Sequence, residues 1–104
     1  MTFTGHENHD ISLNDAGALT SRYRAQMGPR ELKGGFFGKD AIQAILNQAE
    51  CVGIRYYYGL DANNVQVLVL VGTKANGNDI VNGELAEMSI PCPDYCGENN
   101  ALNS

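Results

Sequence analysis

Apolar residues in the first third of the chain recur with the period of a helix. Between positions 13 and 27 they stand three or four apart, which places them on one helical face. Ser12 and Asp15 form a capping box at the start, because the Ser12 hydroxyl can accept a hydrogen bond from the Asp15 amide. The sequence predicts a first helix that begins after Ser12 and ends at Gly28-Pro29. Its apolar face consists of Leu13, Ala16, Leu19, Tyr23 and Met27.

A glycine-rich connector over residues 33–38 leads to a second, shorter helical pattern. Gly38 marks its start, and Asp40 falls in the first turn, where the helix dipole favours an acid. Phe37 and Ile42 are placed to form a hydrophobic staple across that start. The helix is predicted to end between residues 48 and 50, and its buried stripe consists of Ile42, Ile45, Leu46 and Ala49.

After this helix the apolar pattern takes the period of a β-strand. Alternation over residues 52–58 predicts a half-buried strand, and the β-branched, nearly continuous apolar run over 65–72 predicts a central strand. Residues 79–81 and 84–90 are predicted to supply one broken strand or two short ones, separated by Asn-Gly turns. Regular structure is predicted to stop at residues 91–96.

Strands joined by such short turns must run antiparallel. The predicted fold class is therefore α+β, with two N-terminal helices packed on one face of a three- or four-stranded antiparallel meander. Residues 1–10 are predicted to be a mobile leader, 11–96 a single α+β domain and 97–104 a frayed tail. The other sheet face stays open in this arrangement, and its first strand would carry Arg55 and Tyr57 there.

Charge adds a second pattern. The 104 residues have a net charge of -5 and are 43% hydrophobic, which is enough for one modest core. Residues 22–55 hold six basic and three acidic side chains, whereas the remainder holds nine acids and Lys74, so the two parts carry +3 and -8. Such a dipolar chain can orient a charged partner or a second copy of itself. The acidic excess argues against nucleic acid, because phosphate contacts need clustered Lys and Arg.

The sequence also bears on where the protein works. The first ten residues lack the basic and apolar regions of a secretory signal, and the longest aliphatic run, over 65–71, is too short to span a membrane. Three cysteines are a poor match to a secreted disulfide framework. We therefore expect a cytoplasmic protein without membrane insertion.

Six short strings are spread over most of the chain: FFGKD at 36–40, ILNQ at 45–48, CVGIR at 51–55, YYGLD at 57–61, LVLVG at 68–72 and NGND at 76–79. Together they resemble a group of small, functionally uncharacterised bacterial proteins of about this length. The resemblance implies a compact bacterial domain and no catalytic residue.

The connector before the second helix raises the question of phosphate binding. A P-loop needs Gly-x4-Gly-Lys followed by Ser or Thr, whose hydroxyl holds magnesium. Here the first glycine is misplaced and Asp40 stands where the hydroxyl is needed, so no nucleotide site is predicted. A weaker hypothesis remains, in which Gly38 and Lys39 at the helix N-terminus bind a small anion. The alternative is a purely structural loop.

Cysteine and histidine offer a second chemistry. Cys92 and Cys96 do not have the Cys-x-x-Cys spacing of thioredoxin-like sites, but with His6 and His9 they could complete a zinc set. Three alternatives stay open: this metal site, a disulfide formed by Cys92 with Cys96 or by Cys51, and unpaired thiols. Apart from zinc, no cofactor is expected.

Three consecutive tyrosines provide the last candidate. In a strand, Tyr56 and Tyr58 point to one side and Tyr57 to the other. One interpretation makes Tyr56 and Tyr58 core residues and Tyr57 ordinary surface. The other places Tyr57 beside Arg55 as interface anchors, since Tyr and Arg most often carry interfaces, and a strand at the sheet edge could also pair with another chain.

Catalysis has little support, because both histidines lie in the leader, away from any predicted element. The leading hypothesis is a non-catalytic protein-interaction module that binds itself or another protein through the open sheet face or an edge strand. The alternatives are a metal-binding or thiol-redox protein using Cys92 and Cys96, and a small-anion binder at residues 34–39.

Overall fold

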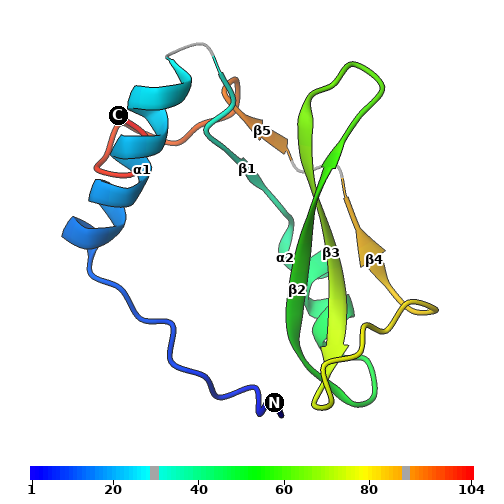
Figure 1. Cartoon of the computed structure of the whole chain (residues 1–104). Helices are drawn as coiled ribbons and strands as arrows, with labels where there is room; N and C mark the ends of the chain where they lie inside the picture. The colour runs from blue at the N-terminus through cyan, green and yellow to red at the C-terminus, as the bar shows by residue number, and fades with distance from the viewer. Residues whose placement is uncertain (29–30, 88–89) are drawn as a thin grey trace. The chain divides into compact units, whose positions relative to one another are not determined.

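The computed structural model describes residues 1–28, 31–87 and 90–104, which form two helices and two antiparallel sheets (Figure 1). The predicted α+β class is confirmed at this level. No helix within these ranges has the length and apolar character needed to cross a membrane. In chain order the elements are α1 (Leu13–Met27), β1 (Gly34–Phe36), α2 (Lys39–Leu46), β2 (Cys51–Leu60), β3 (Gln66–Lys74), β4 (Leu85–Ala86) and β5 (Ile90–Cys92).

The chain divides into two compact units. The first unit consists of Met1–Glu7 and Phe37–Ser89, and the second of Asn8–Phe36 and Ile90–Ser104. The sequence predicted both helices on one sheet, but only α2 belongs to the unit that holds β2, β3 and β4. Hydrophobic periodicity predicts that a helix forms, whereas the element it packs against depends on long-range contacts.

The first unit is built on an antiparallel sheet with the strand order β2-β3-β4. β2 and β3 pair from Leu60 opposite Gln66 to Cys51 opposite Lys74, with a register shift between Cys51 and Gly53. The apolar run predicted as the central strand is β3, and its later residues are buried because they have neighbours on both sides. These buried residues are Leu70, Val71, Gly72 and Thr73.

Helix α2 packs against one face of this sheet, with Ile45 only 1% exposed. Its end is tied down by Gln48, whose side chain donates to the Ile45 carbonyl at 2.9 Å and accepts from the Glu84 amide at 2.7 Å. Gly72 keeps this approach possible, since a Cβ there would lie 2.8 Å from the Gln48 side-chain nitrogen. In Figure 1 the hairpin that joins β2 to β3 extends beyond α2.

The predicted leader is divided between the units. The Phe3 amide donates to the Ala75 carbonyl at 2.8 Å, which holds the N-terminus beside the end of β3 (Figure 1). A Cβ on Gly5 would lie 2.8 Å from the Val52 carbonyl oxygen, so this segment also runs close to the start of β2. Residues 1–7 are thus part of the first unit and residues 8–10 part of the second.

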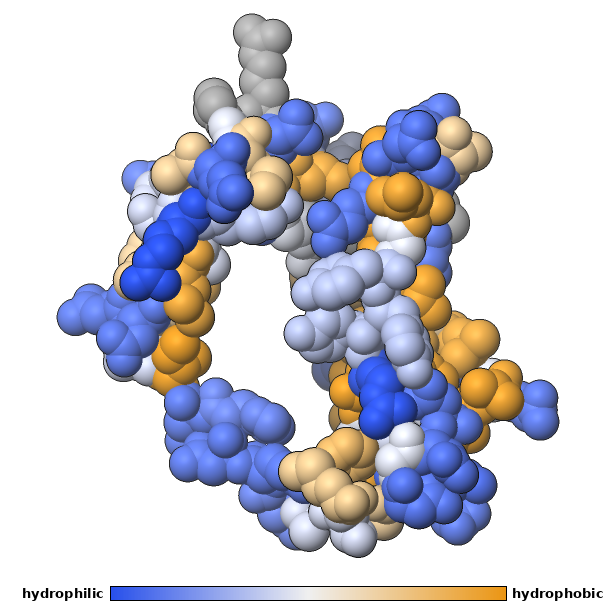
Figure 2. Space-filling view, in the orientation of Figure 1, coloured by the Kyte–Doolittle hydropathy of each residue, from blue (hydrophilic) through white to orange (hydrophobic). Residues whose placement is uncertain are grey.

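The second unit contains α1, which begins as predicted. Ser12 is its N-cap and accepts from the Asp15 amide at 3.1 Å, and Gly28 ends it with a φ of 93° that favours glycine. Pro29, predicted to reinforce that end, and Arg30 of the basic segment lie outside the described residues. No residue of α1 is buried, and Figure 2 shows a row of apolar side chains along it.

A second, two-stranded sheet completes this unit. Gly34, Gly35 and Phe36 of β1 pair with Cys92, Pro91 and Ile90 of β5. β1 was not predicted, and β5 continues past Ile90 into the segment where regular structure was expected to stop, since Gly34-Gly35 and Pro91 have low strand propensity and no alternation. The expected strand over 84–90 is β4 at residues 85–86 and part of β5, with 88–89 outside the described residues, and the expected segment 79–81 supplies one bridge, Thr73 with Asp79.

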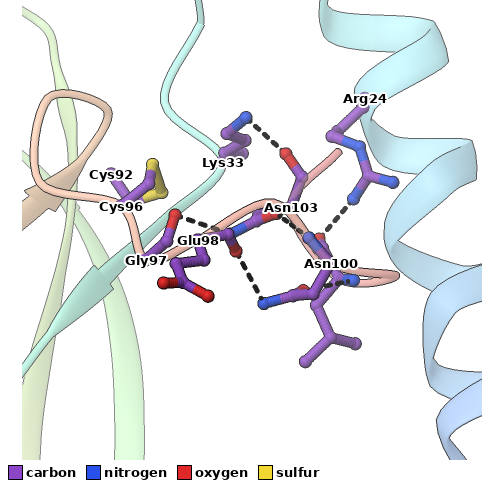
Figure 3. Close-up of a disulfide and its surroundings, with 9 residues drawn as sticks. Arg24, Lys33, Cys92, Cys96, Gly97, Glu98, Asn100 and Asn103 are labelled. Atoms are coloured by element: carbon purple, nitrogen blue, oxygen red, sulfur yellow. Dashed lines mark hydrogen bonds between the residues drawn. A yellow bond between two sulfur atoms is a disulfide. The ribbon is translucent and has the colours of Figure 1, made fainter.

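The C-terminal residues, predicted to be frayed, form a hydrogen-bonded turn in this unit (Figure 3). Asn103 donates to the Glu98 carbonyl at 3.0 Å and accepts from the Asn100 amide at 2.8 Å. The turn is held to the rest of the unit by Arg24, which donates to the Leu102 carbonyl, and by Lys33, which donates to the Asn103 carbonyl at 2.6 Å.

Candidate functional site

Arg55 and Tyr57 lie on one face of β2, as the alternation predicted, and both contact Asp79. The Arg55 guanidinium donates to one carboxylate oxygen of Asp79 at 2.6 Å and to the Gly77 carbonyl at 2.8 Å. The Tyr57 hydroxyl donates to the other carboxylate oxygen at 2.5 Å. Thr73 adds a longer contact of 3.4 Å between its hydroxyl and Asp79. We call the four side chains of Arg55, Tyr57, Thr73 and Asp79 the Asp79 network.

The turn after β3 places Asp79 in this position. Asn76-Gly77 reverses the chain, with Gly77 at a φ of 91°, and the Lys74 amide donates to the Asn78 carbonyl at 2.9 Å. The reversal pairs Asp79 with Thr73 in a β-bridge, so its side chain reaches over β3 toward β2. The Asn-Gly turn was predicted from the sequence, but the role of the acid two residues later was missed.

The network holds Asp79 as a carboxylate. The hydrogen bond from Tyr57, followed by the contacts from Arg55, lowers the pKa of Asp79, and the Asp79 side chain is 16% exposed. Arg55, 32% exposed, also lies 5.8 Å from the centre of the Phe3 ring, within range of a cation–π contact. Because each polar group has a partner inside the unit, the network joins β2 to the 74–79 turn. It offers no uncommitted base or nucleophile.

The backbone pattern shows which edge of β2 is free. The Ile80 amide donates to the Gly72 carbonyl at 2.8 Å, so Gly72 directs its polar groups away from β2. Its cross-strand partner Ile54 therefore forms a non-hydrogen-bonded pair and directs its own amide and carbonyl outward. At the other end of the ladder, the Asp61 amide donates to the Val65 carbonyl at 3.0 Å. This bond gives the same alternation, in which odd-numbered residues direct their backbone groups toward β3 and even-numbered ones direct them outward.

From Ile54 onward, beyond the register shift, the even-numbered residues of β2 present backbone groups at the sheet edge that have no partner among the described residues, while the odd-numbered ones bond to β3. We call the outward set the β2 edge. It lies on the strand that has a neighbour on one side only in the order β2-β3-β4. The β2 edge consists of Ile54, Tyr56, Tyr58 and Leu60.

Side chains of the β2 edge are apolar or aromatic, and three of the four are largely exposed, whereas Ile54 is half-buried. Tyr56 is 56% exposed, Tyr58 71% and Leu60 69%, so the interpretation of Tyr56 and Tyr58 as core residues is wrong. Their rings meet edge to face with centroids 5.7 Å apart. The electrostatic effect of Tyr56 raises the pKa of Tyr58. Alternation predicted the shared side of these residues, but not that α2 ends before reaching them.

The candidate anion loop is divided between the units, with Gly34–Phe36 in the second and Gly38 and Lys39 in the first. Gly38 is the N-cap of α2 and supplies no side-chain hydrogen bond, and Lys39 is the first helical residue. This placement agrees with the predicted helix start. It adds no buried polar group aimed at a ligand, so the anion hypothesis gains nothing beyond a helix N-terminus.

The four candidate metal ligands are not brought together. Cys92 and Cys96 form a disulfide, Cys51 is the free cysteine, His6 lies in the first unit and His9 in the second (Figure 3). No cluster of three or more His, Cys, Asp or Glu side chains able to hold a metal occurs within the described ranges. A bonded sulfur offers no thiolate to a metal, so this oxidised form does not support the zinc hypothesis.

A hollow of about 370 Å³ lies in the second unit, beside the end of α1. Its two cations, Arg24 and Lys33, already donate to main-chain carbonyls of the C-terminal turn. Among the described residues, the hollow therefore has no positive group left without a partner to hold an anion. The comparisons with known proteins add no ligand either: no family model, curated protein or solved structure matches this chain.

Proposed function

We propose that this chain is a non-catalytic protein-interaction module that binds an extended segment of a partner along the β2 edge. The observation that carries the proposal is the coincidence, on the same residues, of outward backbone groups and exposed large side chains. Tyr56, Tyr58 and Leu60 each supply an unpaired amide and carbonyl together with an uncovered apolar surface. Strand addition uses these two features, backbone pairing for affinity and alternate side chains for specificity.

The edge is favoured over the open face of the same strand. On that face Arg55 and Tyr57 are committed to Asp79, and a partner that used them would first have to break these contacts. The β2 edge requires no such loss. β2 also lacks the lysines and prolines that natural proteins use to prevent edge pairing, since Arg55 is its one charged residue.

A selection from a random library of linear peptides tests this function. The wild-type chain is expected to enrich peptides that a Tyr58→Pro variant no longer binds, because proline removes an outward amide without removing a bond to β3. Bound peptides should slow amide hydrogen exchange at Tyr56 and Tyr58. Peptides bound equally by both proteins would contradict binding at this edge, and so would an absence of enriched peptides for a chain that is monomeric in solution.

The disulfide bears on the cellular compartment in which the protein works. The Cys92–Cys96 disulfide weighs against the cytoplasm expected from the sequence, because disulfides persist mainly in oxidising compartments. We therefore favour a compartment in which this bond is maintained. A count of free thiols in protein purified without reductant tests the point, and three thiols would return the expectation to the cytoplasm.

A further inference from the structure

The β2 edge is symmetric about Tyr57. Ile54 and Tyr56 precede it, Tyr58 and Leu60 follow it, and all four direct their backbone groups outward. If an antiparallel copy of the same strand is related by a twofold axis at Tyr57, each outward amide and carbonyl of one copy therefore lies opposite an outward residue of the other. We propose that the segment bound at this edge is β2 of a second copy, with Tyr56 of each copy opposite Tyr58 of the other and Ile54 opposite Leu60. This inference rests on the proposed function.

The side chains fit this register. Residues directly opposite in a sheet point to the same face, so Tyr56 and Tyr58 from both copies would form one group of four rings. In the single chain these two rings already pack edge to face and are more than half exposed. Aromatic pairs across strands stabilise sheets, and the exposed Leu60 would gain a contact with Ile54.

Charge does not oppose the pairing, although the chain as a whole carries -5. Arg55 is the one charged residue of β2, and in this register it stands opposite Gly59 of the second copy. Its charge is compensated by Asp79 of its own chain, at 2.6 Å. No like charges meet along the joint, so the dimer is selected by backbone and ring contacts rather than by ion pairs.

The start of β2 limits the choice of register. Gly5 runs close to the Val52 carbonyl, and the strand has a register shift between Cys51 and Gly53. A pairing centred on Tyr56 would place Leu60 opposite Val52, within this irregular and occupied stretch. Centring the twofold axis on Tyr57 uses only residues 54–60, where the ladder is regular.

Cysteine cross-linking tests the register, in a Cys51→Ser background that removes the free thiol. Opposite residues of a non-hydrogen-bonded pair have Cα atoms about 4.5 Å apart, within the range of roughly 4.4–6.8 Å that a disulfide accepts. Tyr57→Cys is therefore expected to give a covalent dimer on mild oxidation. The matched control is Leu60→Cys, whose two copies would lie about 20 Å apart and should stay uncross-linked. Equal cross-linking of the two variants would overturn the register.

Sedimentation equilibrium on variants that keep Tyr57 provides an independent measurement. The wild-type chain should dimerise, Tyr58→Ala should weaken the dimer, and Tyr58→Pro should raise its dissociation constant at least about tenfold more, because it also removes two backbone hydrogen bonds from the joint. A wild-type monomer at all concentrations, or a dimer indifferent to Tyr58→Pro, overturns the inference. If that monomer still binds library peptides and loses them in Tyr58→Pro, the interaction function stands without self-pairing. If it binds none, both fall.

Discussion

Odd- and even-numbered residues of β2 come from one short sequence of similar side chains, yet their hydrogen-bonding groups differ in whether they have partners. Arg55 and Tyr57 form their backbone bonds with β3 and their side-chain bonds with Asp79, all inside the first unit. Tyr56 and Tyr58 have outward backbone groups and exposed rings. The odd-numbered residues thus make their hydrogen bonds within the first unit, whereas the even-numbered residues have backbone groups available for a partner.

This difference shows that exposure alone does not identify a binding residue. Tyr57 is also 48% exposed, but its hydroxyl has a partner at 2.5 Å, whereas the exposure of Tyr56 and Tyr58 coincides with unpaired main-chain groups. A partner gains more where both side-chain area and backbone bonds are available, because little must be broken first. The same reasoning assigns Arg55 and Tyr57 a structural role in holding the 74–79 turn.

The comparison is most strongly tested by proline at adjacent positions. Tyr57→Pro removes an amide that bonds to β3 and the hydroxyl that bonds to Asp79, so it should destabilise the first unit by about 2–4 kcal/mol. Tyr58→Pro removes an outward amide and should cost less than about 1 kcal/mol in dilute protein. Urea unfolding followed by circular dichroism measures both values. Equal losses would show that the assignment of inward and outward residues is wrong.

The Asp79 network provides the next largest effect. Asp79→Ala leaves Arg55 and Tyr57 without their shared partner, and the expected loss is about 1–2 kcal/mol, moderated by the partial exposure of the carboxylate. Tyr57→Phe removes one of these bonds and should cost about 1 kcal/mol or less. Its matched control is Tyr58→Phe, whose hydroxyl lies at the exposed edge and should matter little. A larger loss in Tyr58→Phe than in Tyr57→Phe would reverse the comparison.

Local features of both regions were predictable from the sequence. Ser12 as a cap, Gly38 as a helix start, the buried run of β3 and the Asn76-Gly77 turn all depend on near neighbours in the chain, and the structure has each of them. Alternation in β2 also placed Arg55 and Tyr57 on one face. These predictions hold because propensity and period act over a few residues.

Features that depend on distant partners were not predictable in the same way. The pairing of Gly34 with Cys92 joins segments that show no strand pattern, and α1 belongs to a different unit from the sheet it was expected to cover. In the sequence Asp79 is one of twelve acids, and its contact with Arg55 exists only because the 74–79 turn folds back over β3. The core assignment of Tyr56 and Tyr58 failed because the length of sheet that α2 covers is a tertiary property.

Low pH should remove the stability contributed by the Asp79 contacts of β2 and leave the Tyr58 side unchanged, an effect smaller than those of the substitutions above. The pKa of Asp79 is lowered in the folded chain, chiefly by the Tyr57 hydrogen bond, so its contribution to stability is present above the ordinary carboxyl range near pH 4 and is lost as the pH falls through the lowered value. The wild-type chain should lose this share of stability below about pH 5. Asp79→Asn should lack that part of the decline, whereas Tyr58→Phe should retain it. Parallel curves for wild type and Asp79→Asn would argue against a charged network.

Reduction of the Cys92–Cys96 disulfide should have the smallest effect on β2, because the bond lies in the second unit and ties β5 to the turn that follows it. Unreduced, denatured protein should show one thiol, that of Cys51, and reduced protein three. In reduced protein, amide exchange should quicken around β1 and β5, whereas Arg55 and Tyr57 should keep the protection that their bonds to β3 provide. Loss of that protection on reduction would mean that the hydrogen bonds of Arg55 and Tyr57 depend on the second unit. The difference between odd- and even-numbered residues of β2 would then not be a property of the first unit alone.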